Sequence, residues 1–197
     1  MSRTRSRAGT SFARPTEAEL AAAAGRGIRD VIAPSLAVLF VGINPGLYSA
    51  ATGHHFARPG NRFWPALHQS GFTKRQLHPS EQSELLKAGY GITNLVNRGT
   101  AAAEELDPAE FVVGRKRLAA TVRRYRPRTL AFLGVGAYCH AFSIRKARIG
   151  QQSETFEGAH VWVLPNPSGL NANYQLPDLV KLFRSLRQSW QRGSTSR

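Results

Sequence analysis

The sequence predicts a single three-layer α/β domain, with a mainly parallel sheet of four or five strands between two layers of helices. Two observations support this prediction. Short apolar, β-prone runs alternate along the chain with amphipathic helical patterns, as in strand–helix–strand units whose strands pair in parallel. The chain has 197 residues, the usual size of one domain with one hydrophobic core.

Four runs are predicted to form the sheet. The first, Leu36 to Ile43 (LAVLFVGI), is almost continuously apolar, which is typical of a strand buried on both faces, and Asn44-Pro45-Gly46 ends it. The other three runs each precede a polar or Gly/Pro-rich turn: Ile92 to Val96, Thr129 to Gly134 and His160 to Leu164. In such sheets the working residues gather at the carboxyl ends of the strands.

Apolar residues at helical spacing predict the covering helices. Pro127 ends the first of them and Asn61 is the expected N-cap of another, in which Pro65 is tolerable only near the first turn. A further stretch, Ala137 to Phe142, also reads as helical. The apolar positions are Phe111, Leu118, Val122 and Tyr125; Phe63, Trp64 and Leu67; and Leu179, Phe183, Leu186 and Trp190.

The two ends of the chain differ in composition from the middle. Residues 1–16 are rich in Arg, Ser and Thr with little apolar content, and residues 193–197 repeat that character. Both ends are therefore predicted to be disordered, and the folded domain is predicted to span residues 17–192. For the N-terminal tail, an arm that contacts DNA is an equal alternative to disorder without a specific role. No internal repeat and no linker divides that span.

Composition excludes several classes of protein. The single cysteine, Cys139, allows no internal disulfide and cannot supply the thiolates of an iron–sulfur cluster or a structural zinc site. No window approaches the ~18 apolar residues of a membrane span. We expect a reduced, soluble, cytoplasmic protein, associated with the nucleoid if the source is bacterial, that needs no metal and no cofactor.

The charge points to a polyanionic partner. The chain carries 27 Lys and Arg against 12 Asp and Glu, a formal net charge of +15, and the stretch from Val112 to Ser153 contains ten cations and no carboxylate. Such runs attract nucleic acid by neutralising phosphates and releasing counterions. A solvated basic face without a partner is the alternative.

Two loops combine features that suit a binding site. The first runs from Gly42 to Trp64 and the second from Leu164 to Leu170, and in each an Asn stands beside proline and glycine at a strand end. The first loop also contains the aromatic ring of Phe56. Together these features suit a flat polar ligand that stacks on a ring and is read by main-chain groups. A stiff structural turn is the alternative for the first loop alone.

Four motifs carry a resemblance to a known family: GINPGL at 42–47, FARPGNRFW at 56–64, GITNLV at 91–96 with its Arg-Gly-Thr follow-on, and LPNPSGL at 164–170. In this order the chain resembles the mismatch-specific uracil/thymine DNA glycosylases of the uracil-DNA glycosylase superfamily, over about Leu36 to Trp190. The resemblance implies a uracil-DNA glycosylase-like fold and a monomeric, monofunctional enzyme of base excision repair. Its partner would be double-stranded DNA with a G·U or related mismatch.

The resemblance also implies roles for individual residues. Asn44 would orient the water that attacks the sugar, and Phe56 would stack on the extruded base. Asn166 would lie near the leaving base, while Gly169, Leu170 and Asn171 would form the wedge that enters the duplex and contacts the widowed guanine. The full base pocket implied by the resemblance comprises Ile43, Gly46, Leu47, Ser49, Phe56 and Asn166.

The chain departs from the family pattern at two positions. Ala172 stands where some members have an Arg that grips the duplex, and Asn94 stands where some have a Lys. These departures leave the grip on DNA in question, and we expect Arg58, Arg62 or the basic stretch 115–128 to contact the DNA backbone instead.

The catalytic residue implied by the resemblance is chemically modest. An uncharged amide can position water but cannot remove its proton as a carboxylate can, so Asn44 predicts a slow enzyme. Glu105, beyond the second strand, is a candidate supplementary base, with a solvated or helix-capping acid as the alternative. No lysine stands in the first or last motif to form a Schiff base, so strand cleavage is not expected.

Several other residues are expected to be structural. His54 and His55 are predicted to be exposed in the first loop, and Phe63 and Trp64 to belong to the core. Cys139 and His140 are predicted to be packing residues of an apolar helix. The second hypothesis for function is a non-catalytic lesion-binding protein that keeps the pocket but lacks turnover. A third and weaker one is a hydrolase of small nucleotides, and acceptance of thymine stays open.

Overall fold

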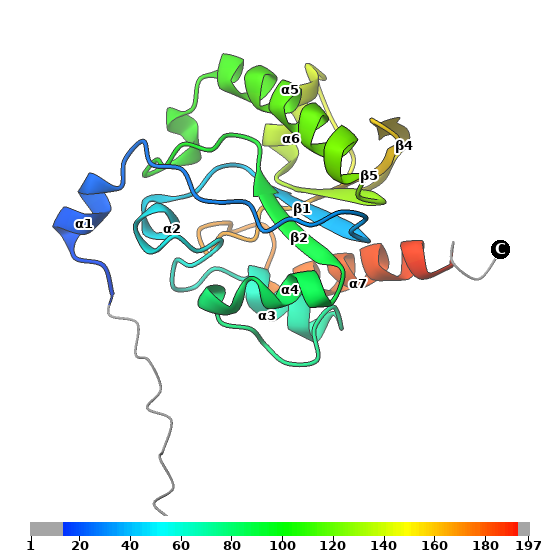
Figure 1. The fold of residues 1–197 in the computed structure, drawn as a ribbon, viewed down its shortest axis with the longest axis horizontal. Coiled ribbons are helices and arrows are strands. Elements are labelled where there is room, and N and C mark those ends of the chain that lie inside the picture. Colours follow the sequence, from blue (N-terminus) through cyan, green and yellow to red (C-terminus); the bar gives the residue numbers. More distant parts are fainter. Residues whose placement is uncertain (1–13, 193–197) are drawn as a thin grey trace, which may run out of the picture.

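A five-stranded sheet organises the computed structural model, which describes residues 14–192 (Figure 1). The strand order is β2-β1-β3-β5-β4, and only β4 runs antiparallel to its neighbour. The strands are β1 (Val38–Gly42), β2 (Tyr90–Asn94), β3 (Thr129–Leu133), β4 (Gly150–Phe156) and β5 (Ala159–Leu164). The predicted three-layer α/β fold with its mainly parallel sheet is confirmed. The predicted disorder of the two ends lies almost wholly outside the described residues.

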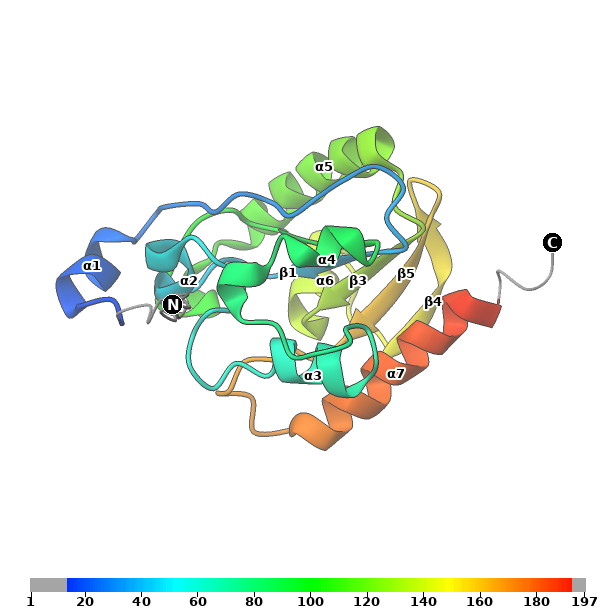
Figure 2. The same cartoon turned by 60° about the horizontal axis from the view of Figure 1, so that its bottom comes forward.

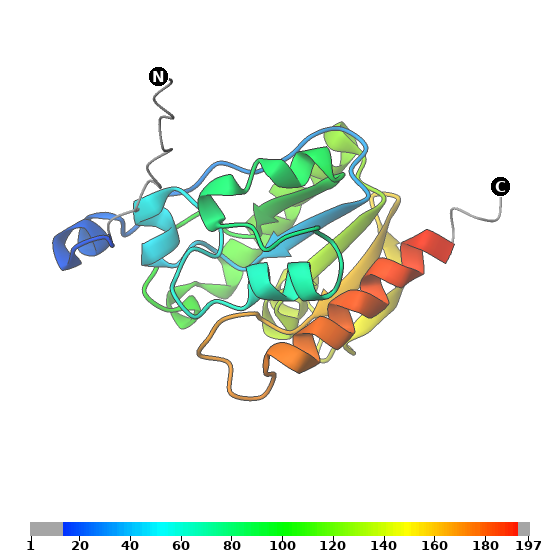
Figure 3. The same ribbon diagram turned by 90° about the horizontal axis from the view of Figure 1, so that it is seen from below.

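Helices cover both faces of the sheet (Figures 1 and 2). One face carries α5 (Pro108–Tyr125) and α6 (Val135–Phe142), and the other carries α3 (Phe63–Gln69), α4 (Glu84–Lys87) and α7 (Leu176–Arg192). Two short helices, α1 (Glu17–Ala22) and α2 (Leu47–Thr52), pack together at the end toward which β1 points (Figure 3). Two 3-10 turns, Pro79–Glu81 and Ala103–Glu105, complete the regular structure.

The register of the central strands brings their carboxyl ends to one line. Gly42, the last residue of β1, lies opposite Asn94, the last residue of β2. On its other side β1 pairs in parallel with β3. The chain therefore leaves β1 between two neighbouring strands, which is where parallel sheets form their ligand crevices.

Residues of β1 alternate between two hydrophobic cores, as expected of a strand buried on both faces. Val38 and Phe40 pack with α3 and α7, whereas Leu39 and Val41 pack with α5 and α6. Phe40 is fully buried and lies 5.4 Å from the ring centroids of Phe63 and Phe72. Aromatic contacts of this kind add to the hydrophobic stabilisation of the core.

Several elements differ from the prediction. The edge strand β4 (GQQSETF) has a mostly exposed surface, so hydrophobicity carries little signal for it. Thr16 caps α1, an element that the apolar pattern does not reveal. The N-cap of α3 is Arg62, whereas Asn61 was predicted. Asn61 lies one residue before the cap, and its side chain still accepts a hydrogen bond from the Phe63 N–H, the first of the helix, at 2.9 Å.

One predicted packing residue is also corrected. His140 is exposed on α6, where its ring stacks against Phe111 at 5.4 Å between centroids. It therefore covers the core from outside instead of being enclosed in it. Phe63 and Trp64 are buried as predicted. In the part of the chain that the structure describes, no helix is long and apolar enough to span a bilayer.

Phe40→Ala is expected to lower the free energy of unfolding by about 3–5 kcal/mol, because it leaves a cavity between β1 and the α3/α7 layer. Urea denaturation followed by circular dichroism measures the change. Val113→Ala, at a side chain that is 65% exposed, is the control and should change the stability by less than about 1 kcal/mol. Equal losses in the two variants would contradict this account of the core.

Candidate active site

A cavity of about 340 Å³ opens at the carboxyl edge of the sheet, and both motif loops line it. The loop after β1 contributes one wall and the loop after β5 the other, and Asn94 at the end of β2, on the far side of β1 from β5, also lines the cavity. The predicted site residues that line the cavity are Ile43, Asn44, Gly46, Ser49, Phe56, Arg58, Asn166, Leu170 and Asn171. Four others, Leu47, Arg62, Gly169 and Glu105, are not among its lining residues.

The side chain of Asn44 is fixed by its amide nitrogen. Nδ2 donates hydrogen bonds to the Arg98 carbonyl oxygen at 2.9 Å and to Thr100 Oγ1 at 2.7 Å. The Thr100 hydroxyl donates its own proton to the Ala102 carbonyl oxygen at 2.7 Å, so toward Asn44 it can only accept. These partners define which end of the amide is nitrogen.

The amide oxygen of Asn44 is consequently the end available to a ligand. No hydrogen bond to Oδ1 is formed within residues 14–192, and the partly buried side chain lines the cavity. A carbonyl-type oxygen accepts but does not donate a hydrogen bond. Asn44 can therefore hold a water molecule by one of its protons and aim the oxygen of that water.

Arg98 ties the Asn44 loop to the rest of the domain. While its carbonyl oxygen accepts from Asn44, its guanidinium forms a two-pronged pair with Glu110 of α5, with both N···O distances 2.8 Å. This pairing, together with the Asp107 N–H, lowers the pKa of Glu110 to about 2. The Arg98 to Thr100 segment is thus held at both ends.

Asn94 is a site residue to which the sequence assigned no role. It is 3% exposed, lines the cavity and has a buried Nδ2 with no hydrogen-bond partner in the described structure. Leaving such a donor unpaired costs about 1–3 kcal/mol, which a ligand oxygen would relieve. The sequence predicted a strand over Ile92 to Val96, with Asn94 in its middle, whereas β2 ends at Asn94 and so brings this amide to the edge of the sheet.

Glycine at position 42 makes room for Asn94. A Cβ built on Gly42 would lie 2.4 Å from Asn94 Oδ1 and 3.3 Å from Cζ of Phe56. Both contacts are closer than ordinary van der Waals packing, so any larger residue would push one of the two side chains aside. The first glycine of the GINPGL motif is therefore required by a close approach across neighbouring strands.

Side chains of Asp30 and Arg117 hold the end of β2 in place. Thr93 donates a hydrogen bond to Asp30 Oδ1 at 2.8 Å, and Arg117 of α5 donates to the carbonyl oxygens of Asn94 and Leu95. Arg117 also lies 4.0 Å from Asp30 Oδ2. Burial raises the pKa of Asp30 although Thr93 and Arg117 oppose that effect. These contacts hold the backbone from which the Asn94 side chain projects.

Phe56 occupies the wall of the cavity in a constrained conformation. Its backbone adopts φ of +53°, in the left-handed region, and its ring stacks on Phe63 at 4.1 Å between centroids. Such a backbone angle costs a bulky residue about 1–2 kcal/mol. Ser49 Oγ holds the adjoining turn by accepting from the Ala57 N–H at 3.1 Å. These contacts fix the position of the Phe56 ring, so a flat ligand can stack on it.

The loop after β5 is organised by its own side chains. Asn166 Oδ1 accepts from the Ser168 N–H at 3.0 Å, and Asn171 Nδ2 donates to the Asn166 carbonyl oxygen at 2.9 Å. This arrangement leaves the Asn166 amide nitrogen as the group available to a ligand in the cavity. At the tip of the loop Leu170 is 73% exposed, a costly position for an apolar side chain unless a partner covers it.

Arg62 fastens the two loops together. Its guanidinium donates to the carbonyl oxygens of Gly169 at 2.9 Å, of Asn171 at 3.1 Å and of Tyr174. The structure thus gives Arg62 a bracing role, and its expected contact with a DNA phosphate stays a prediction. Gly169 packs directly on this region, since a Cβ there would lie 2.6 Å from the Gly60 carbonyl oxygen.

Glu105 caps a turn at the side of the cavity. Its carboxylate accepts from the Ala102 N–H at 2.9 Å and the residue is exposed. This contact favours the capping alternative over a supplementary base. Glu104, its neighbour, lines the cavity. Within residues 14–192, no group of three or more His, Cys, Asp or Glu residues is placed to hold a metal ion.

His55 is buried, contrary to the prediction of an exposed loop. It is 1% exposed and its Nε2 donates to the Arg29 carbonyl oxygen at 3.0 Å, while its main chain bonds Gln82 and Trp64. Burial lowers the pKa of His55 to about 4. His54 is half-buried, and burial lowers its pKa as well. Sequence spacing alone does not reveal that the indole of Trp64 and the 28–31 segment enclose this loop.

The acid-free stretch from Val112 to Ser153 is only partly placed to meet a ligand at the site. Arg117 and Arg123 are engaged with Asp30 and Glu157. Arg126 and Arg128 lie just before the start of β3, at the opposite edge of the sheet from the cavity. The expected compensating grip by residues 115–128 therefore falls mostly on another part of the surface.

Comparison with known families identifies the class of this protein. Residues 29–192 match the model of the "Uracil DNA glycosylase superfamily", and the chain belongs to that superfamily. Membership supports a DNA glycosylase activity, with DNA as the partner.

Comparison with solved structures supports the fold. A solution structure of a Methanosarcina acetivorans protein, provisionally named a uracil DNA glycosylase, is similar with a TM-score of 0.57 and 18% sequence identity. The match covers 83% of this chain and 98% of that one. At this identity the likeness concerns the fold alone.

We expect stability to fall between about pH 6.5 and pH 4.5 because of His55. Its folded pKa, about 4, lies below the ordinary value of 6.5, so the unfolded chain takes up the proton first. The stabilisation is complete above the unfolded pKa and is lost as the pH falls toward the folded pKa, up to about 3 kcal/mol. Urea unfolding at several pH values measures it.

His55→Gln is the matched variant for this prediction. It removes the titrating ring but leaves the carboxylates whose pKa values are lowered, such as Glu81 and Glu110, and these act only at lower pH. The variant should therefore show a shallower fall over the same range. A fall as steep as that of the parent protein would assign the effect to other groups.

Proposed function

We propose that this protein is a monofunctional DNA glycosylase of the mismatch-specific uracil type. It would remove uracil mispaired with guanine from double-stranded DNA and leave an abasic site for base excision repair. The single observation that carries the proposal is the convergence of Asn44, Asn94 and Asn166 in one cavity beside the ring of Phe56. A pyrimidine ring offers the carbonyl and N–H groups that such amides recognise.

Access to the cavity requires the nucleotide to leave the duplex. A base inside the stack cannot reach a recessed pocket, so the enzyme flips it out at a cost of about a few kcal/mol, which is least for a mismatched pair. The exposed Leu170 stands at the cavity mouth. Inserted into the gap that the base leaves, it would offset part of the lost stacking. Preference for a mismatch follows in part from this energy balance.

The chemistry assigned to the pocket is hydrolysis of the bond between C1′ of the deoxyribose and N1 of uracil. The bonding electron pair leaves with the base, and the oxygen of a water molecule held by Asn44 Oδ1 attacks C1′. The proton of that water passes to solvent or to the departing base. Because Asn44 cannot take up the proton, the rate depends on how well the leaving base carries negative charge.

Donors in the pocket would stabilise that charge. Asn94, with its unpaired Nδ2, and Asn166, with its free amide nitrogen, both line the cavity, where these nitrogens would donate to the oxygen atoms of a bound uracil. Preorganised donors of this kind contribute most when they are shielded from water. We infer a slow enzyme in which leaving-group stabilisation carries more of the catalysis than water activation.

We further propose that the protein acts as a monomer in the cytoplasm. Arg58 is the cation of the first loop that lines the cavity wall and is exposed, so it is the candidate for contact with the DNA backbone.

The alternative function is a lesion-binding protein without turnover. The anchoring of Asn44, which leaves its oxygen toward the cavity, favours the enzyme, because a sensor has no use for a positioned water.

A duplex with one G·U pair tests the proposal. After incubation with the protein and treatment with alkali, the uracil strand should break at the abasic site, and Asn44→Ala should reduce the single-turnover rate by about 100-fold or more. Without alkali the strand should stay intact. Binding of the same duplex by the parent protein, with no alkali-sensitive product, would support the sensor instead.

Leu170→Ala is expected to slow excision from duplex DNA about 10-fold or more and to weaken binding of the abasic product, because the gap left by the base is no longer filled. Single-stranded DNA containing uracil has no partner strand to restack, so the variant should release uracil from it nearly as fast as the parent protein does. Single-turnover rates on the two substrates give the comparison. Losses of equal size on both would contradict the wedge role.

A further inference from the structure

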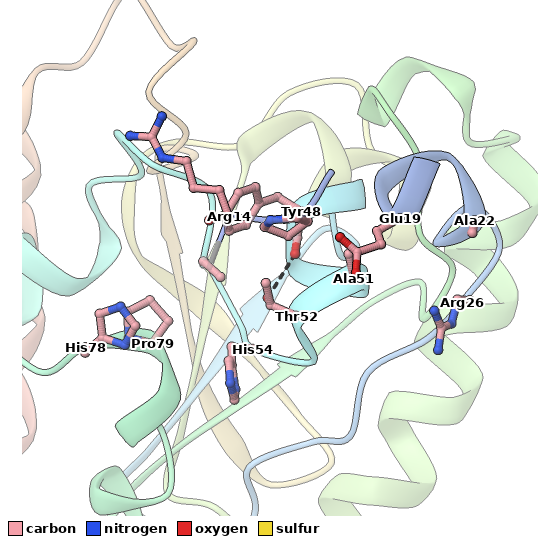
Figure 4. A pocket seen from close by; sticks show the side chains of 12 residues that line it. Arg14, Glu19, Ala22, Arg26, Tyr48, Ala51, Thr52, His54, His78 and Pro79 are labelled. Atoms are coloured by element: carbon pink, nitrogen blue, oxygen red, sulfur yellow. Dashed lines mark hydrogen bonds between the residues drawn. The ribbon is translucent and has the colours of Figure 1, made fainter. Parts of the chain in front are cut away.

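A second cavity, of about 420 Å³, lies across α2 from the candidate active site, and Figure 4 shows the side chains that line it. The segment that leads into α1, the helix α2 and the turn at residues 78–79 enclose it. The side chains that give it chemical character are Arg14, Glu19, Arg26, Tyr48, His54 and His78. None of them has a role in the site described above.

The cavity presents positive charge that is not neutralised locally. Neither Arg14 nor Arg26 takes part in an ion pair within residues 14–192, and both are exposed. The carboxylate of Glu19, the one acid of the lining, already accepts from the Thr16 N–H at 2.7 Å and from the Thr16 hydroxyl at 2.9 Å. Two guanidinium groups and one capped carboxylate favour an anionic ligand.

The helix α2 separates this cavity from the active site. Ser49 on α2 lines the active-site cavity, whereas Tyr48 and Thr52 line the second one. The following loop is divided in the same way, because His55 and Phe56 face the first cavity while His54 and Ala57 face the second. The two cavities are thus only one short helix and one loop apart.

The backbone of Arg26 is hydrogen-bonded to the segment that anchors the Asn44 side chain. Its carbonyl oxygen accepts from the Gly99 N–H at 2.9 Å, and the Gly25 N–H donates to the Gly99 carbonyl oxygen at 2.9 Å. Gly99 directly precedes Thr100, which is a hydrogen-bond partner of Asn44. The backbone that carries Arg26 is therefore held at a set position relative to the active site.

We propose that this second cavity binds the phosphodiester backbone of the DNA strand a short way along from the flipped nucleotide. Arg14 and Arg26 would neutralise phosphates, and the ring of Tyr48 would pack against the sugar or base between them. This inference rests on the proposed function, because the flipped nucleotide fixes where the rest of the strand lies. It would supply a grip on the duplex in addition to the predicted contacts of Arg58 and Arg62.

The chemistry of the lining distinguishes this ligand from others. Arg14 and Arg26 carry positive charge at neutral pH, while burial and the neighbouring His78 lower the pKa of His54. Both arginines are exposed, so a continuous strand can reach them from solvent. A free mononucleotide could satisfy the same groups, and the experiment separates the two.

The test compares Arg14→Ala/Arg26→Ala with the parent protein in binding to a G·U duplex over a range of salt concentrations. Each neutralised phosphate contributes about 0.9 to the slope of log affinity against log salt, so the double variant should have a slope smaller by about 1 to 2. The single-turnover rate at saturating protein should be unchanged, because neither arginine touches the reacting atoms.

Arg124→Ala/Arg128→Ala is the matched control, since both residues are exposed and lie near the start of β3, away from the active-site edge. It removes the same charge and should leave the slope within experimental error of the parent. Equal slopes in all three proteins, or equal losses in both double variants, would overturn the proposal. A mononucleotide site would also overturn it: the parent protein would bind dUMP saturably, the Arg14/Arg26 variant would not, and the variant would still bind the duplex as the parent does.

A matched pair of shortened duplexes adds a second readout. Trimming the DNA on one side of the uracil should weaken binding by the parent but not by the Arg14/Arg26 variant, whereas trimming the other side should weaken both. If trimming on either side weakens the parent and the variant alike, the cavity does not hold the strand. Because these are binding measurements, they remain informative if the parent protein releases no uracil, an outcome that would contradict the glycosylase proposal alone.

Discussion

The hydrogen bonds that Asn44 donates to Arg98 and Thr100 are the interaction on which the rest of the site depends. They join the loop after β1 to the loop after β2, and in doing so they fix which face of the Asn44 amide meets a ligand. The same loops exchange main-chain bonds, with the Leu47 N–H donating to the Thr100 carbonyl oxygen at 3.1 Å. The nitrogen of this one amide therefore holds the two loops together, while its oxygen is left to bind a ligand.

The groups of the site that would meet a ligand are mostly neutral amides, which determines both how they can bind it and what catalysis they can supply. Amides at the ends of three parallel strands can orient a ligand and donate to it without the desolvation cost of a buried charge. They supply no strong base, however. The charged residues close to the site, Arg62 and Arg98, are turned to structural use, with their guanidinium groups bound to carbonyl oxygens or to Glu110. The positive charge available to a polyanion is that of the exposed Arg58 at the cavity wall and of the arginines around the second cavity.

Much of the fold could be predicted because its elements are locally encoded. Phe111, Leu118 and Val122 repeat at helical spacing and are buried in α5, and the apolar run before Asn44 forms a strand buried on both faces. The elements that were missed lack such a signal. The strand β4 is hydrophilic because it lies at an edge, and its place in the sheet comes from pairing with β5. His55 is buried by residues distant in sequence, which no local pattern reports.

By itself the sequence determined the layered α/β class, the two turns with their amides, and the expectation that these turns meet at one edge. Apolar periodicity and turn chemistry act over a few residues, so they can be read directly. Only the tertiary structure decided the roles of Asn94, Arg62 and Arg26, because each depends on contacts between distant segments. The strand register sets Asn94 against Gly42. Loop packing turns Arg62 onto three carbonyl oxygens, and the fold of α1 against α2 creates a cavity that no local pattern encodes.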